Sequence, residues 1–178
     1  MLKSVPRLIF ISVRNGLIAG LLGIVFLVAL YYIGRHPFLF PIFFDFRLIL
    51  FVVFMVIGLK ELRDDHQQGI LSFGEGMIST LIFTIIFASV TALLISFFCW
   101  LEPSFVVDYK RLAAEQLAKV SAQVIEQWGK GVQESNLAAL STTTGQQLAL
   151  DYFMKSFIIS FFISIIISVI LRRQPKTN

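Results

Sequence analysis

The 178-residue chain is poor in the side chains on which most soluble proteins depend: it has one cysteine, two histidines and few charges. Charged residues make up 15% of it, whereas a soluble globular domain has about 25%. A single cysteine excludes an internal disulfide and a cysteine-based zinc cluster. Hydrophobic residues make up 57%, which excludes an ordinary soluble domain and indicates a membrane protein.

Positive charge is not concentrated in any one region of the chain. The net charge is +4, but the basic residues flank apolar runs instead of forming a basic face on a soluble fold. We therefore expect no nucleic-acid partner and take the lipid bilayer as the main one. Nineteen phenylalanines suit lipid contact, where each backbone group must be hydrogen-bonded internally, so helices are the expected spanning elements.

Long uncharged runs predict four transmembrane helices. A helix rising about 1.5 Å per residue needs about twenty residues to cross a hydrocarbon core of about 30 Å. The second run is uncharged only over residues 48–59, so it crosses only if it extends back past Arg47 to about Phe43. The approximate spans are residues 16–34, 43–59, 76–101 and 152–171. The predicted fold class is an all-α membrane protein with a single membrane domain, residues 1–178.

Basic residues next to the predicted spans indicate the orientation. The N-terminal tail, the loop after the second span and the C-terminal tail all carry Lys or Arg, and in a four-span protein they share one side. A cleaved signal peptide is the competing interpretation of the first run, which is longer than a usual signal sequence and ends without small residues. Because basic flanks stay in the cytoplasm, we expect a multi-pass protein of the bacterial inner membrane with both termini cytoplasmic.

Small residues recur at every fourth position in three of the predicted spans. They let helix backbones approach closely in lipid, so a sustained repeat favours helix packing over incidental serine and threonine. Whether these faces meet within one chain or between chains stays open. The candidate packing residues are Gly16, Gly20, Ala19 and Gly23; Thr80, Thr84, Ala88, Ala92 and Ser96; and Ser156, Ser160, Ser164 and Ser168.

The segment 102–151 between the third and fourth spans is polar and predicts a helix outside the membrane. Residues 104–128 fit an amphipathic helix, with Asp108, Arg111 and Glu115 opposite Ala113 and Leu117. A second short helix is expected over 133–140, followed by a turn at 141–145. The mixed charge of the first helix favours contact with protein, in this chain or another, over contact with lipid.

Reactive side chains are scarce and scattered. His36 and His66 fall on opposite sides of the predicted membrane and cannot share a metal ion. The group Asp64, Asp65 and His66 is explained more simply as a solvated loop than as a metal site. The motifs of serine hydrolases, phosphate-binding loops and zinc proteases do not occur. We expect no enzyme activity, no catalytic residue, no metal and no cofactor.

The order of these parts resembles a bacterial membrane family, domain of unknown function 4199, of the Bacteroidota type. The resemblance covers nearly the whole chain and rests on short segments at 15–18, 60–64, 69–75 and 102–103. It implies a four-helix inner-membrane protein and carries no established activity. Loop residues in these segments are candidates for functional contacts: Lys60, Arg63, Asp64, Gly69, Phe73, Gly74, Glu75, Glu102 and Pro103.

Two functional hypotheses follow from these features. The first is a non-enzymatic assembly or interaction component that contacts other copies of itself, as a homo-oligomer, or another membrane protein. The alternative is a small transporter or channel subunit, in which the Thr and Ser faces of the third and fourth spans line a polar path. An intramembrane enzyme is the least favoured, because the reactive side chains are not clustered.

Overall fold

The computed structural model describes residues 5–40, 46–119 and 130–174. Within these ranges the chain is all-helical, as the sequence predicts, and the only backbone pairing outside helices and turns joins Leu71 to Arg173. The helices are α1 (Val5–Tyr32), α2 (Phe46–Glu61), α3 (Phe73–Leu101), α4 (Ser104–Ala118), α6 (Lys130–Thr142) and α7 (Gly145–Leu171), with a 3-10 turn η1 (Pro37–Leu39) and a π-helical turn η3 (Leu62–His66).

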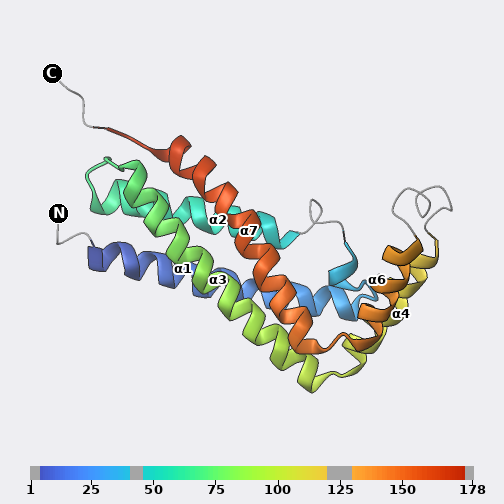
Figure 1. Ribbon diagram of the computed structural model, residues 1–178. Helices are drawn as coiled ribbons and strands as arrows, with labels where there is room; N and C mark the ends of the chain where they lie inside the picture. The colour runs from blue at the N-terminus through green and yellow to red at the C-terminus, as the bar shows by residue number, and fades with distance from the viewer. Residues whose placement is uncertain (1–4, 41–45, 120–129, 175–178) are drawn as a thin grey trace.

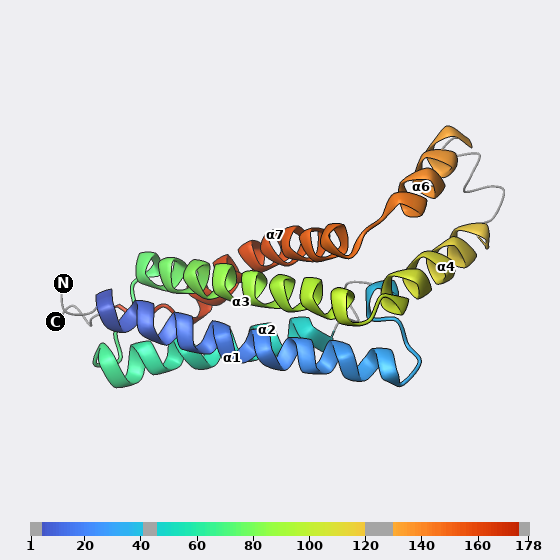
Figure 2. The same cartoon turned by 90° about the horizontal axis from the view of Figure 1, so that it is seen from below.

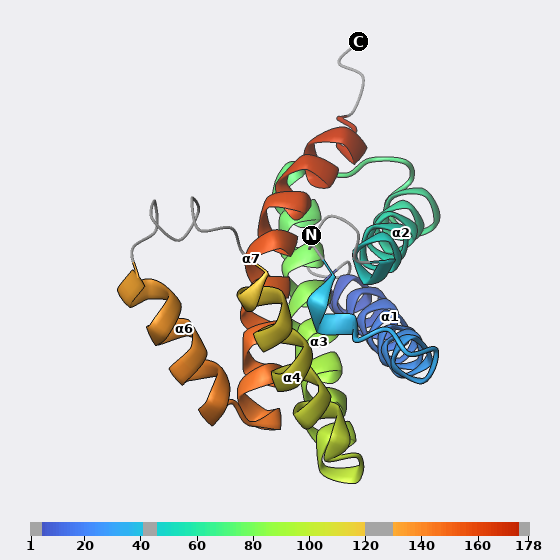
Figure 3. The same ribbon diagram turned by 90° about the vertical axis from the view of Figure 1, so that its right-hand side faces the viewer.

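The four longest helices form two antiparallel pairs that lie across each other, α1 with α2 and α3 with α7 (Figure 1). Helix α3 packs between α1 and α7 (Figure 3). The start of α1, the end of α7 and η3 lie at one end of the bundle, here called the terminal end. Helices α4 and α6 contact each other and project from the opposite end of the bundle (Figure 2). This pair of helices is here called the hairpin, and that end of the bundle the hairpin end.

Three of these helices are long and apolar enough to cross a membrane: Pro6–Tyr32, Phe73–Leu101 and Gly145–Leu171. Helix α2 has 16 residues, and at about 1.5 Å per residue it falls short of a hydrocarbon core of about 30 Å. The part of the predicted second span that precedes Phe46 lies outside the described residues. The crossing by the predicted second span therefore stays a prediction.

Two of the spanning helices extend well beyond the uncharged runs that predicted them. Helix α1 begins at Val5 instead of residue 16, and the Arg14 guanidinium pairs with the carboxylate of Glu61 at the end of α2. Helix α7 begins at Gly145 instead of residue 152, because the Thr144 side chain caps its first turn. An uncharged run therefore marks only the apolar part of a helix, and the start of α7 is set by its cap.

The helices outside the bundle differ in length from those predicted. Helix α4 ends at Ala118, so the predicted helix 104–128 is seen only in its first part, and residues 120–129 lie outside the described residues. Helix α6 covers Lys130–Thr142 and is longer than the predicted 133–140. The predicted turn shortens to two residues, because α6 runs through Thr142 and the α7 cap begins at Thr144.

Two apolar cores hold the helices together. In the first, Phe51 of α2 meets Phe83 and Phe87 of α3 with ring centroids 5.2 Å apart in both pairs. In the second, at the hairpin end, Phe105 of α4 is fully buried with Leu27 of α1. Offset and edge-to-face aromatic pairs add about 0.5–1.5 kcal/mol each beyond their buried area.

Small residues let α3 approach both of its main neighbours. A Cβ atom built at Gly16 of α1 would lie 3.0 Å from the carbonyl oxygen of Phe83. One built at Gly76 of α3 would lie 3.2 Å from the Cβ of Ser168, on α7. At the other end of the same pair, a Cβ at Gly145 would lie 2.5 Å from the Cβ of Cys99, closer than two carbon atoms can pack.

We predict that Gly145→Ala destabilises the α3–α7 pair. The new methyl group would overlap Cys99, and such overpacking typically costs about 1–3 kcal/mol. The measurement is the thermal unfolding midpoint in mild detergent. Gly74→Ala is the matched control, because Gly74 also lies in the first turn of a capped helix and has nothing within 4 Å of an added Cβ. Equal midpoints for the two variants would contradict the packing.

Candidate functional site at the hairpin end

A cluster of aromatic side chains joins α1, η1 and α4 at the hairpin end. Phe105 is fully buried at its centre, with the His36 ring 4.4 Å away between centroids. Tyr31, Phe38 and Tyr109 surround the same histidine at centroid distances of 5.5–6.1 Å. Because these residues come from three separate segments, the cluster fixes the connection after α1 against the first turns of α4.

His36 is held by two hydrogen bonds that require its neutral form. The backbone N–H of Phe38 donates to Nδ1 at 3.4 Å, which assigns the ring hydrogen to Nε2. Nε2 then donates to the carbonyl oxygen of Phe105 at 3.0 Å. Burial lowers the pKa of His36 below its ordinary value of 6.5, and the Phe105 carbonyl and the Asp108 carboxylate offset only part of that effect.

A polar contact reinforces the same junction. The Tyr31 hydroxyl donates to Asp108 Oδ2 at 3.2 Å and lies 3.2 Å from the hydroxyl of Ser104. On the far side of Asp108, Arg111 donates to its other carboxylate oxygen at 3.2 Å. The first turn of α4 is therefore tied to the end of α1 by both apolar and polar contacts, which sets the direction in which the hairpin projects.

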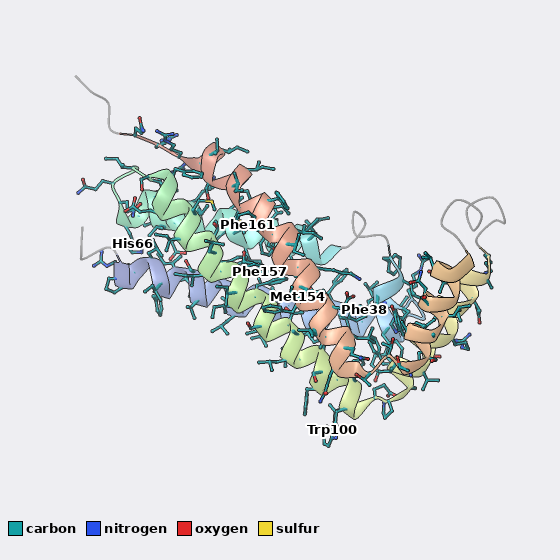
Figure 4. All side chains as sticks on the ribbon, viewed as in Figure 1. Phe38, His66, Trp100, Met154, Phe157 and Phe161 are labelled. Carbon is teal, nitrogen blue, oxygen red and sulfur yellow. The ribbon has the colours of Figure 1, made fainter. Side chains whose placement is uncertain are left out.

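A cleft of about 140 Å³ opens beside this junction, between η1, the first turns of α2 and the side of α7. Its apolar wall includes Phe38, Phe51 and Ile159. Its polar wall comes from one side of α7 and includes Asp151 and Lys155, which form an ion pair at 2.6 Å. Figure 4 shows Phe38 near α7 at this end of the bundle, with Met154 further along that helix.

A second, more open depression of about 530 Å³ lies between α4 and α6 and is here called the hairpin groove. Tyr109, Ala113 and Leu117 of α4 face Ala139 and Leu140 of α6 across it. Its remaining lining residues are Leu39, Gln116, Asn136 and Thr143. The groove thus uses the apolar face of α4 predicted from the sequence, while Arg111 and Glu115 on the other face are exposed and paired with each other at 3.2 Å.

The glycine face predicted in the first span lies against α3 of the same chain. Gly16 and Gly20 approach Ile86 and Val90 closely, and Ala19 is fully buried. Gly23 has ordinary contact with Phe87. These residues therefore take part in packing within the chain.

The two Ser, Thr and Ala faces predicted in the third and fourth spans lie inside the same bundle for most of their length. The buried members are Thr80, Thr84, Ala88, Ser160, Ser164 and Ser168, whereas Ala92, Ser96 and Ser156 are half-buried. The Ser164 hydroxyl points to the sulfur of Met55 in α2 at 4.0 Å. Two buried hydroxyl oxygens, those of Thr84 and Ser168, have no hydrogen-bond partner among the described residues.

The loop candidates at the terminal end mostly have structural roles. Glu75 and Ser72 form a capping box at the start of α3, and the Gln67 amide donates to Glu75 at 3.0 Å. Gly69 has a φ of +80°, a conformation that glycine adopts without strain. Lys60, Phe73 and Gly74 are exposed.

Arg63 is the one buried charged side chain of that loop. Its guanidinium forms two hydrogen bonds to Asp64, at 2.6 and 2.9 Å, and donates to the carbonyl oxygen of Leu171 at 3.4 Å. The hydrogen bonds from Arg63 lower the pKa of the Asp64 carboxyl. Arg63 therefore satisfies a carbonyl at the end of α7, where a positive charge is also favoured by the helix dipole.

At the other connection, Glu102 and Pro103 lie between α3 and α4. The Glu102 backbone N–H donates to the carbonyl of Phe98 at 2.8 Å and ends α3. The Glu102 carboxylate accepts a short hydrogen bond from Ser104. The Pro103 carbonyl accepts from Val106 at 3.2 Å, so the pair forms a tight corner between the two helices.

Comparison with known proteins places these segments in one family. The family described as a protein of unknown function, DUF4199, matches residues 14–173. The chain belongs to this family. No curated protein and no solved structure matches the chain. The match covers α1 from Arg14, the whole of the hairpin and α7, so the features described above lie within the DUF4199 region.

The segments on which the family resemblance rests are spread over both ends of the DUF4199 bundle. The segments 60–64 and 69–75 lie at the terminal end, and 102–103 lies at the hairpin end. His36 and His66 lie at opposite ends, and Figure 4 labels His66 at the terminal end. Among the described residues, no three His, Cys, Asp or Glu side chains are close enough to hold a metal ion.

The sequence did not single out His36, Asp151 or Lys155 as members of one site. His36 appeared as a loop histidine, and Lys155 fell inside the predicted span 152–171 without a role of its own. Two local signals did exist: proline follows His36, and Asp151 and Lys155 have the i,i+4 spacing of a helical ion pair. Neither signal shows that both segments border the same cleft.

We predict that the protein loses stability as the pH falls from 7.5 to 5.5, in part through His36. The unfolded chain gains a proton near pH 6.5, whereas the folded chain resists protonation because the pKa of His36 is lowered. The stability that neutral His36 contributes is therefore complete at the upper end of this pH range and is lost as the pH falls through it. Thermal unfolding midpoints in detergent measure this, and His36→Gln should flatten the dependence. His66→Gln is the control, and equal flattening by both variants would contradict the prediction.

Proposed function

We propose that the protein is a non-enzymatic, four-span component of the bacterial inner membrane that binds another protein through the hairpin groove. The supporting observation is the groove itself, an open and mostly apolar depression between two helices that project from the bundle. Amphipathic helices commonly recognise each other through such grooves. The bound protein is a second copy of this chain or another membrane protein.

The positions of the small-residue faces favour the groove over the membrane helices as the contact surface. Gly16 and Gly20 are occupied by α3, and Ser160, Ser164 and Ser168 are buried in the same bundle. The same positions weaken the channel hypothesis, which needs the Thr and Ser faces of α3 and α7 to line a path in an oligomer. A helix of a partner protein can reach the hairpin groove without disturbing any of these contacts.

The charges support cytoplasmic termini. Arg7, Lys60, Arg172 and Arg173 are exposed at the terminal end. At the hairpin end, Asp108, Glu115, Asp151 and neighbouring acidic groups balance the basic residues. Because Lys and Arg near the spans tend to stay in the cytoplasm, we expect the hairpin and its groove on the outer side of the inner membrane.

The groove is tested by photo-crosslinking in intact cells. A benzophenone amino acid at Leu117 or Ala139 lies in the groove, whereas one at Glu115 lies on the opposite, charged face of α4. We expect the two groove positions to give one discrete crosslinked product and position 115 to give none. Mass spectrometry of that product distinguishes a second copy from another protein. The same crosslinks from all three positions, or from none, would contradict the proposal.

The orientation is tested separately with reporter fusions. A fusion after Asn178 is expected to be active with a cytoplasmic reporter, and one after Gln127 with a reporter that works only outside the cytoplasm. A cytoplasmic signal at Gln127 would overturn the four-span arrangement, because residues 102–151 would then share a side with the C-terminus.

A further inference from the structure

The cleft beside α7 has the chemical character of a lipid-headgroup site, and this inference does not depend on the hairpin groove. Its walls combine apolar side chains from η1, α2 and α3 with an ion pair and serine hydroxyls from α7. Ser160, at its inner side, is 2% exposed, whereas Asp151 and Lys155 are about half exposed. A purely apolar occupant would remove water from this ion pair and offer neither charge a further hydrogen bond, so an occupant with polar groups of its own fits the cleft better.

The cleft lies at the border of the apolar part of α7. Residues 156–171 are uncharged, and Lys155 is the last charged residue before them. Leu48, near the start of α2, lines the same cleft, so α2 begins close to the level of Lys155. Charged side chains at such a depth face water or polar headgroups instead of acyl chains.

The order of the two charges along α7 matches the order of charges in one class of lipid. In a phospholipid with a phosphoethanolamine headgroup, the phosphate is next to the acyl chains and the ammonium is further out. Lys155 adjoins the uncharged run of α7, and Asp151 lies one turn further from it. Phosphate beside Lys155 and ammonium beside Asp151 would both form charge-assisted hydrogen bonds.

The surface of α7 next to Lys155 suits the acyl chains of such a lipid. Ile158, Phe162 and Ile166 follow Lys155 on the same side of the helix and are 52%, 62% and 58% exposed. At about 1.5 Å per residue, Ile166 lies about 16 Å along the axis from Lys155. This length matches one leaflet of a hydrocarbon core about 30 Å thick.

We propose that the cleft between η1, α2 and α7 binds one zwitterionic phospholipid through Lys155 and Asp151, with a phosphoethanolamine headgroup in the cleft and its acyl chains along α7. An anionic lipid without an ammonium group would satisfy Lys155 only and would be repelled by Asp151. A phosphocholine headgroup carries a cation without N–H donors, so it cannot donate a hydrogen bond to the Asp151 carboxylate.

The test is native mass spectrometry of the delipidated full chain in detergent. Dioleoyl phosphatidylethanolamine, phosphatidylglycerol and phosphatidylcholine are added separately at equal concentration. We expect one phosphatidylethanolamine to bind about fivefold or more tightly than either other lipid, since it gains a charge-assisted hydrogen bond that each of them lacks. Equal binding of all three, or preference for phosphatidylglycerol, would overturn the proposal.

A charge-swap variant separates lipid binding from helix stability. Asp151→Lys combined with Lys155→Asp retains an i,i+4 ion pair but reverses its direction, so we expect the preference for phosphatidylethanolamine to disappear. The control reverses Glu115 and Lys119, two exposed charges of the same spacing on α4 that do not line the cleft, and should retain it. Retention of the preference in the Asp151 and Lys155 swap would contradict the proposal.

A single substitution provides a second test that does not depend on folding of the double variant. Asp151→Asn leaves Lys155 without its adjacent carboxylate and removes the negative charge that the ammonium group would meet. We expect the preference to shift from phosphatidylethanolamine to phosphatidylglycerol, because the cleft then carries net positive charge. An unchanged preference would show that Asp151 does not contact the headgroup and would overturn the proposal.

Discussion

The close approach of α3 to α1 and α7 is the constraint on which the rest of the structure depends. Lipid supplies little hydrophobic drive for helix association, so van der Waals contact at small residues must hold the spans together. Gly16 and Gly20 let α1 reach α3, while Gly76 and Gly145 mark two close contacts of α3 with α7. With these surfaces buried in one bundle, its exposed apolar side chains are left for the bilayer.

Helix length explains why polar features gather at the hairpin end. Helix α2, with 16 residues, is much shorter than the 27 to 29 residues of α1, α3 and α7, so it accompanies them for only part of their length. The η1 turn lies beside the first turns of α2, where both line the cleft. The hydrogen bond from His36 to the Phe105 carbonyl holds the η1 connection against α4. The cleft remains between this connection and α7. The His36 contact and the cleft thus both follow from the short length of α2.

The sequence predicts features that repeat along one helix and misses those that join distant segments. The four-residue spacing identified Gly16, Thr84 and Ser164 as packing candidates, and all three are buried. Helices α1 and α7 begin at Val5 and Gly145, ahead of the predicted spans that begin at residues 16 and 152, because an apolar run indicates the lipid-facing part of a helix and not its first residue. His36 could not be recognised as a junction, since its partner Phe105 is distant in the chain and only the folded structure brings them together.

The central claim is that the small-residue faces of α3 and α7 meet within one chain. The most direct measurement is disulfide crosslinking of Gly76→Cys with Ser168→Cys in a Cys99→Ser background, because a Cβ added at Gly76 would lie 3.2 Å from the Cβ of Ser168, a little inside the roughly 3.5–4.5 Å of a disulfide. The account predicts a crosslink within the monomer that is independent of protein concentration on a non-reducing gel. A product of dimer size as the main species would contradict it.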